Sequence, residues 1–352
     1  MKLYKKFIVA SYLKNFFIIF FSLQLFYTAV EVVPNLKYIT DSANLKVLFF
    51  VFKFLNAINF TLPLSIIFAL IASKFQIIRT NELLSIYASG IGKNEVIKPI
   101  FIVALFISSM HITLNMTEFV YANTYADNIK SFNLIQKQQN NIFLKHFDTY
   151  VYFEKFDRFK KEAINIQVYK IKDNQLEEMI KAKVAKYKDK YWEIVDAQII
   201  KKVVDENITK LVFTKKKSIK LLEGFKPQII KSLYAKNSKS AISIIDAVWA
   251  LILFKDQKVD TGKIRASLYK MVFFPLFAPF FIIILFYKLP ISIRFFNITY
   301  MTSIFIISSL LSWGILFFLI KISINSVIMP EIGIILPIFS IGLYSLYLYL
   351  KK

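Results

Sequence analysis

The chain has 352 residues, of which 56% are hydrophobic, and it carries a formal net charge of +23 and no cysteine. Its apolar share exceeds the roughly 45–50% of soluble globular proteins, and its apolar residues form long runs, which indicates a membrane protein. The lack of cysteine excludes disulfides, thiolate metal sites and cysteine nucleophiles. The positive charge has two interpretations, a lysine-rich composition bias or contact with anionic headgroups or an anionic substrate.

Six apolar segments are long enough for a membrane-spanning helix, which needs roughly 20 residues. They lie near residues 15–33, 49–73, 98–117, 268–287, 298–320 and 332–350. Three spans therefore precede a long interval and three follow it, which predicts an α-helical six-span membrane domain with a domain inserted at its centre.

Basic residues are unevenly shared among the short loops. One set of loops, together with both chain ends, holds Lys2, Lys5, Lys6, Lys14, Lys74, Arg79, Lys93, Lys98, Lys288, Arg294, Lys351 and Lys352. The opposite loops hold Lys37, Lys46 and Lys321. Because basic short loops stay in the cytoplasm, both termini are predicted to be cytoplasmic and the inserted domain to lie outside.

A polar stretch, TNELLSIYASGIGKNEVIKP (80–99), joins the second and third spans. It predicts a short helix over 80–90, with Thr80 or Asn81 as its cap, Glu82 in its first turn and Gly90 at its left-handed end. Two faces follow from the helical spacing, with Leu83, Leu84 and Tyr87 on one and Glu82, Ser85 and Ser89 on the other.

This helix has two interpretations. It is a plain interfacial helix that eases a tight turn, or it is a coupling helix over about 80–95 that docks into a cytoplasmic partner and offers Glu82 to a basic residue there. The adjacent GIGK (90–93) is not a phosphate-binding loop, because the glycine spacing is wrong and Asn94 stands where Ser or Thr is required. The chain is therefore not expected to hydrolyse ATP.

The inserted domain is predicted to be all-β. Residues 149–156 and 164–173 alternate between apolar and polar, Asp173-Asn174 marks a turn, and the same pattern continues over 179–217. Successive strands without intervening helices predict an antiparallel sandwich or jelly roll. Helical spacing returns over 241–254, which predicts a short amphipathic helix at the outer membrane surface.

No catalytic, cofactor or metal site is predicted, and no nucleic-acid partner. His111 lies inside the third span and is expected to be packed or hydrogen-bonded, while His146 lies at the start of the β domain. An ion-coupled carrier would need a functional intramembrane acid, for which Glu31 and Glu118 are the candidates.

The order of these features resembles the LptF/LptG permeases of bacterial lipopolysaccharide export. The element after the second span matches at Glu82, Leu83, Ala88, Ser89 and Gly90. In the β domain the family pattern is matched by Ala182, Ala185, Trp192, Ile194, Asp196 and Ala197, and near the fourth span by Pro275 and Arg294.

The resemblance implies a jelly-roll-like periplasmic domain at 118–267 between spans 1–3 (1–117) and spans 4–6 (268–352). It implies a permease subunit in the bacterial inner membrane that pairs with a paralogous six-span subunit on a cytoplasmic ABC ATPase dimer, with ATP and Mg bound in that ATPase. The lipopolysaccharide would pass to periplasmic jelly-roll bridge proteins. The residues implied in ATPase coupling are Arg79, Glu82, Leu83, Ser85, Tyr87, Ser89 and Gly90.

Lys37 and Lys46 are candidates for contact with lipid phosphates, since ammonium groups form charge-assisted hydrogen bonds with phosphate. Ordinary snorkelling at the interface is the alternative for Lys37. For the whole chain, the alternative is a membrane-anchored scaffold or sensor whose β domain binds an envelope ligand or protein. A scaffold needs no coupling helix, so charge reversal at Glu82 would then be silent.

Overall fold

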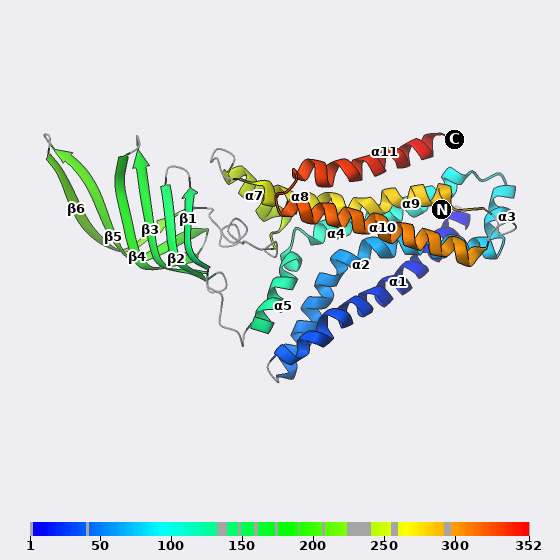
Figure 1. The fold of residues 1–352 in the computed structure, drawn as a ribbon, viewed down its shortest axis with the longest axis horizontal. Coiled ribbons are helices and arrows are strands. Elements are labelled where there is room, and N and C mark those ends of the chain that lie inside the picture. The colour runs from blue at the N-terminus through cyan, green and yellow to red at the C-terminus, as the bar shows by residue number, and fades with distance from the viewer. Residues whose placement is uncertain are drawn as a thin grey trace. The chain divides into compact units, whose positions relative to one another are not determined.

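The computed structural model of the chain (Figure 1) describes residues 3–39, 42–131, 139–146, 149–157, 161–172, 175–188, 190–205, 208–223, 241–254, 260–291 and 297–351. Lys2, Asp173, Asn174, Arg294 and Lys352, which carry sequence-based predictions, lie outside these residues, as does the side chain of His146. The chain divides into a helical unit, Met1–Leu134 with Arg265–Lys352, and a sheet unit, Ile135–Ile264.

The helical unit contains six helical segments long and apolar enough to cross a membrane, which confirms the six predicted spans. They are α1 (Leu3–Val32) with η1 (Val33–Tyr38), α2 (Ala43–Arg79), α4 (Lys93–Leu114), α8 (Gly262–Phe273) with η3 (Phe274–Leu276) and α9 (Phe277–Lys288), α10 (Ile298–Ile324), and η4 (Glu331–Ile335) with α11 (Leu336–Leu350). Most of these helices begin before, or end after, the apolar runs, because helical hydrogen bonding continues into the polar flanks.

One apolar core joins the spans. Side chains such as Tyr12, Ile66 and Phe277 are fully buried in it. Polar side chains inside the spans find local partners, as where the Thr61 hydroxyl donates to Gln24 Oε1 at 2.5 Å. This is the expected arrangement in a bilayer, where water cannot satisfy a buried polar group.

Residues 118–131 belong to the helical unit instead of the β domain in which the sequence placed them. They form η2 (Glu118–Tyr121) and α5 (Ala122–Ser131). Ala126 of α5 is buried against Phe49 of α2, Val32 and Ile39, and this small apolar cluster explains why the segment stays with the helices.

The sheet unit confirms the predicted inserted all-β domain. Its six antiparallel strands are β1 (Gln139–His146), β2 (Thr149–Asp157), β3 (Glu162–Lys172), β4 (Gln175–Lys188), β5 (Tyr191–Asp205) and β6 (Ile208–Leu221). Each strand pairs with its neighbour in the chain, in the order β1-β2-β3-β4-β5-β6. The described strands thus form one curved meander (Figure 1), whereas a complete jelly roll has two sheets with Greek-key connections.

A line of irregular pairing crosses the middle of this sheet. Glu154 and Asn165 are not paired in the ladder between β2 and β3. Lys183 is likewise not paired between β3 and β4, nor Asp196 between β4 and β5. Asn165 and Asp196 have left-handed backbones, with φ of 50° and 51°, a conformation that Asn and Asp tolerate better than most residues.

The alternation of buried residues changes phase at this line. On one side of the line the buried residues are Val151, Phe153, Ile166, Val168, Ala197 and Ile199. On the other side of the line they are Phe156, Ala163, Ala185, Trp192 and Ile194. Because a one-residue shift reverses the direction of every later side chain, the irregularity keeps these buried apolar residues on one face of the sheet on both sides of the line. The irregularity also places Ile164 on the exposed face. Strict alternation from Ile166 would place it on the buried face.

The predicted helix over 241–254 is confirmed as α7 (Ile244–Phe254). Ala247 and Ala250 are buried, whereas Ile245, Val248, Trp249 and Ile252 form an exposed apolar stripe. An apolar stripe that stays exposed is typical of a helix that lies at a membrane surface, which remains a prediction for α7.

Candidate functional site

The loop between α2 and α4 contains a separate short helix, α3 (Glu82–Ala88), at the end of the helical unit where both chain termini lie (Figure 1). Asn81 turns the chain out of α2 with a left-handed backbone, φ 60°. The predicted side-chain cap is absent. The Thr80 hydroxyl donates back to the Gln76 carbonyl at 3.2 Å, and Asn81 offers only its backbone carbonyl, to the Ser85 N–H at 3.1 Å.

The end of α3 follows the prediction. Gly90 has φ +83°, a left-handed conformation that glycine adopts without steric cost. Its N–H donates to the Tyr87 carbonyl at 3.0 Å, and the Ser89 hydroxyl donates to the Ile86 carbonyl at 2.7 Å. These bonds satisfy carbonyl groups that the last turn of a helix otherwise leaves unpaired.

α3 packs onto the helical core through Leu83, Ile86 and Tyr87. Leu83 is 2% exposed, and the other two pack around it. The predicted face contained Leu84 instead of Ile86, but Leu84 is 50% exposed. Positions 83, 86 and 87 follow the i, i+3, i+4 spacing of one helical face, and Leu84 is one step around the helix from it.

The outer face of α3 presents charged and polar groups. Glu82 is partly buried beside a cavity of about 260 Å³ that Lys14, Gln76 and Thr80 also line. In the part of the chain that the structure describes, neither the Glu82 carboxylate nor the exposed Arg79 guanidinium has an ion pair or a side-chain hydrogen bond. Ser85 is exposed next to them, so this face has unused charge and hydrogen-bonding capacity.

Tyr87 packs against the helical core, and Tyr287 of the fourth span acts on its hydroxyl. Burial raises the pKa of the Tyr87 hydroxyl to about 12, and the nearby Tyr287 adds to this effect. The fold therefore favours the neutral form of the hydroxyl, which suits a side chain held against an apolar core.

Polar contacts tie the start of α4 to three other spans. The Tyr4 hydroxyl of α1 donates to Glu95 Oε2 at 2.8 Å. The Tyr287 hydroxyl of α9 donates to the Asn94 side-chain oxygen, and the Asn94 amide donates to the Tyr349 carbonyl of α11 at 3.1 Å. A displacement of the start of α4 would therefore be transmitted to α1, α9 and α11.

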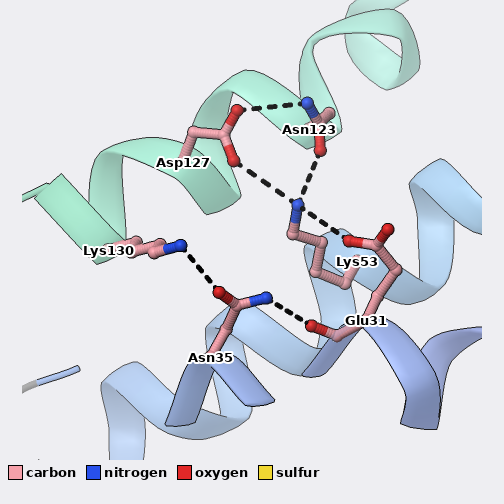
Figure 2. A network of polar contacts seen from close by, with 6 residues as sticks. All are labelled: Glu31, Asn35, Lys53, Asn123, Asp127 and Lys130. Atoms are coloured by element: carbon pink, nitrogen blue, oxygen red, sulfur yellow. Dashed lines mark hydrogen bonds and ion pairs between the residues drawn. The ribbon is translucent and has the colours of Figure 1, made fainter. Parts of the chain in front are cut away.

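The other end of the helical unit holds a buried lysine in a polar network (Figure 2). Lys53 Nζ of α2 donates to Asn123 Oδ1 at 2.8 Å and lies 3.4 Å from Asp127 Oδ1 and 3.6 Å from Glu31 Oε2. Lys130 Nζ donates to Asn35 Oδ1 at 2.6 Å. The network fastens α5 to α1, η1 and α2.

Sequence reasoning missed this network. The signal that identifies it is the spacing of Asn123, Asp127 and Lys130, which places three polar side chains on one face of the ten-residue helix α5. Lys53 gives no such signal, because a lone lysine in an apolar run does not reveal its partners.

The two lysines predicted to meet phosphate lie near this end. Lys37 is exposed, with its Nζ 5.0 Å from the centre of the Tyr38 ring, and Lys130 Nζ lies 4.9 Å from the same ring. Lys46 is half-buried in the first turn of α2. The structure thus adds Lys130 to Lys37 as a second cation beside Tyr38, while Lys46 belongs to another element.

The two acids that an ion-coupled carrier would need are engaged in other contacts. Glu31 pairs with Lys53, and Glu118 Oε2 accepts from the Tyr125 hydroxyl at 3.0 Å. His111 Nε2 lies 3.0 Å from Asn59 Oδ1, which confirms that this histidine is hydrogen-bonded between two spans.

Comparison with known families gives one finding that covers almost the whole chain. The family model described as "Lipopolysaccharide export system permease LptF/LptG" matches residues 6–351. No individually curated protein matches the chain.

Proposed function

Because the chain belongs to the lipopolysaccharide export permease family LptF/LptG, we propose that it is one of two paired permease subunits driven by a cytoplasmic ABC ATPase. The family membership and the six apolar helices make it a multi-pass inner-membrane permease subunit. The partner subunits, the orientation and the role of each residue belong to the proposal.

The observation that carries the proposal is the free carboxylate of Glu82 on a helix fixed to the membrane core. Leu83 holds α3 in place, while Glu82 and Arg79 have no partner among the described residues. A docking helix needs this combination, since it must resist displacement on one face and offer unpaired charge on the other. ATP hydrolysis in the partner would move α3, and the contacts of Asn94 and Glu95 would pass the movement to the spans.

The opposite end of the helical unit supports an outward path for an anionic lipid. Lys37 and Lys130 beside Tyr38, together with Lys46, supply cations for lipid phosphates. In this proposal both termini and α3 are cytoplasmic, and the sheet is periplasmic. The buried apolar residues on one face of the sheet, such as Phe153 and Ile166, then suit acyl chains.

The edge strand β6 suits a periplasmic bridge protein. β6 is the last strand of the described sheet, and its Phe213 is 72% exposed next to the exposed Val212. An edge strand presents unpaired backbone groups to which another chain can add a strand. A jelly-roll bridge protein would extend the sheet there.

The test is affinity purification of the tagged chain in mild detergent, with mass spectrometry of all retained proteins. Wild type is expected to retain an ABC ATPase and a second six-span permease. Glu82→Arg is expected to lose the ATPase but keep the permease, because like charges at a docking contact cost several kcal/mol.

Glu118→Arg is the matched control, since it reverses an exposed carboxylate at the other end of the helical unit. It is expected to retain the ATPase. Equal retention by wild type and Glu82→Arg, or no ATPase with either, would refute the coupling role and favour a membrane-anchored scaffold.

A further inference from the structure

An apolar groove runs along the helical unit between α4, α9 and α11. It has a volume of about 640 Å³, and its walls are formed mostly by bulky side chains such as Phe101, Phe280, Phe339 and Leu346. Of the described residues that line it, Lys98 is the only charged one. One end of the groove reaches the polar contacts at the start of α4 described above, because Tyr349 is part of its lining.

The groove exists because α11 contacts α9 along a narrow strip. Ile338 and Ser345 are buried there, and Gly342 lies between them, where an added Cβ would come 3.6 Å from the Phe280 ring. The neighbouring side chains of α11, among them Phe339 and Leu343, are more than half exposed. This apolar surface needs an occupant at membrane depth.

One end of the groove is polar. Lys98 is exposed one turn after Asn94, whose side chain bonds to Tyr287 and to the Tyr349 carbonyl. Glu95, the acidic residue nearest to Lys98 in the sequence, accepts a hydrogen bond from the Tyr4 hydroxyl. Within the described residues, the Lys98 ammonium has no carboxylate partner.

We propose that this groove binds an anionic glycerophospholipid, with an acyl chain along the apolar walls and the headgroup phosphate at Lys98. A basic residue at the end of an apolar groove complements such a lipid in charge and in polarity. A transmembrane helix is a poorer occupant, because helices meet closely over small residues and these walls are built from Phe, Ile and Leu.

The bound lipid would connect α11 to α4. α4 begins directly after α3, so the lipid would hold the span that follows the coupling helix against the last span. The inference takes from the proposed function only the orientation that places Lys98 in the cytoplasmic leaflet, where anionic lipids attract basic residues.

The experiment is native mass spectrometry of the full chain, purified with whatever subunits it retains, during titration with phosphatidylglycerol or with phosphatidylcholine of the same acyl chains. Wild type is expected to bind one phosphatidylglycerol about fivefold more tightly than phosphatidylcholine. Lys98→Glu should abolish this preference. Lys288→Glu, which reverses another exposed lysine at the same end of the bundle, should keep it.

A second pair of variants tests the acyl-chain part of the site. Ile102→Trp fills the groove from α4 and should weaken both lipids, whereas Phe106→Trp, one turn further along α4 and outside the lining, should not. Equal binding of the two lipids by wild type, or equal effects within either pair of variants, would overturn the proposal. The readout is lipid binding and not retention of an ATPase, so its failure would leave the coupling role of Glu82 standing. Failure of the coupling role would likewise leave the lipid site standing.

Discussion

The ammonium group of Lys74 lies 2.5 Å from the backbone carbonyl oxygen of Phe286, 212 positions later in the chain. It also donates to the Leu289 carbonyl at 3.0 Å and lies 4.3 Å from the centre of the Phe286 ring. These carbonyls belong to the last turn of α9 and the residue that follows it, where helical partners are missing. A lysine of the second span therefore caps the fourth span.

Lys74→Met should destabilise the helical unit. Methionine keeps the aliphatic stem but leaves two carbonyls in a buried site without donors, which is expected to lower the free energy of unfolding by about 1–3 kcal/mol. Thermal unfolding in detergent micelles measures the change. Lys288→Met, at an exposed lysine of the same end, should have little effect, and equal loss in both variants would contradict the capping role.

Gly90→Ala should loosen the end of α3, whereas Gly92→Ala should not. Neither glycine has any atom within 4 Å of an added Cβ, so the two differ in backbone conformation and not in space. Only Gly90 has a positive φ, where a side chain costs about 1–2 kcal/mol. Hydrogen exchange of the amides over 82–90 should be faster in Gly90→Ala alone; similar exchange in the two variants would show that the left-handed turn is not required.

Lys53→Met should weaken the attachment of α5 to α2. Its ammonium group neutralises Asp127 and Glu31, and without it these carboxylates face one another, at a cost of about 1–3 kcal/mol. Thermal unfolding again measures the loss. The double variant Lys53→Met/Asp127→Asn should recover part of it, and Lys37→Met is the exposed control. No recovery in the double variant would mean that the charge pairing contributes nothing.

The raised pKa of Tyr87 predicts a loss of stability at alkaline pH. In the unfolded chain the phenol releases its proton near its ordinary pKa of 10.0, whereas in the folded chain it does so near about 12. The folded state therefore holds the extra proton between these values, so the contribution is complete below pH 10 and is lost as the pH rises toward 12.

Tyr87→Phe should remove this part of the pH dependence. Unfolding measured at about pH 9 and about pH 12 should show a smaller difference for the variant than for wild type. Tyr300→Phe, at an exposed tyrosine of α10, should behave as wild type does. If both variants match wild type, the Tyr87 hydroxyl is not held in its neutral form by the fold.

The spans and the position of α3 could be predicted from the sequence because each depends on local properties. Long apolar runs identify bilayer helices, and Gly90 marks the end of a helix by its conformational freedom alone. The cap of α3 could not be predicted, because the Thr80 hydroxyl donates back to the Gln76 and Ile77 carbonyls of α2 instead of accepting from an N–H of α3. The burial of Ile86 instead of Leu84 depends on where the core lies around α3, which local spacing does not contain.

The lysine contacts were beyond sequence reasoning for a different reason. The sequence predicts Lys74 to be a basic loop residue, yet its partners are backbone carbonyls more than 200 positions away. Lys53 likewise depends on the return of α5 to the helical unit, against the predicted boundary at 118. In the sheet, strict alternation failed at Ile164 because the left-handed Asn165 changes the phase within the strand.

That change of phase decides how probes on the apolar face of the sheet must be placed. A crosslinker introduced at every second residue of β5 reaches the apolar side from Trp192 and Ile194, but beyond Asp196 the same series would point to the opposite side. The productive series continues at Ala197 and Ile199. The positions of β5 that face the apolar side therefore have even numbers before Asp196 and odd numbers after it.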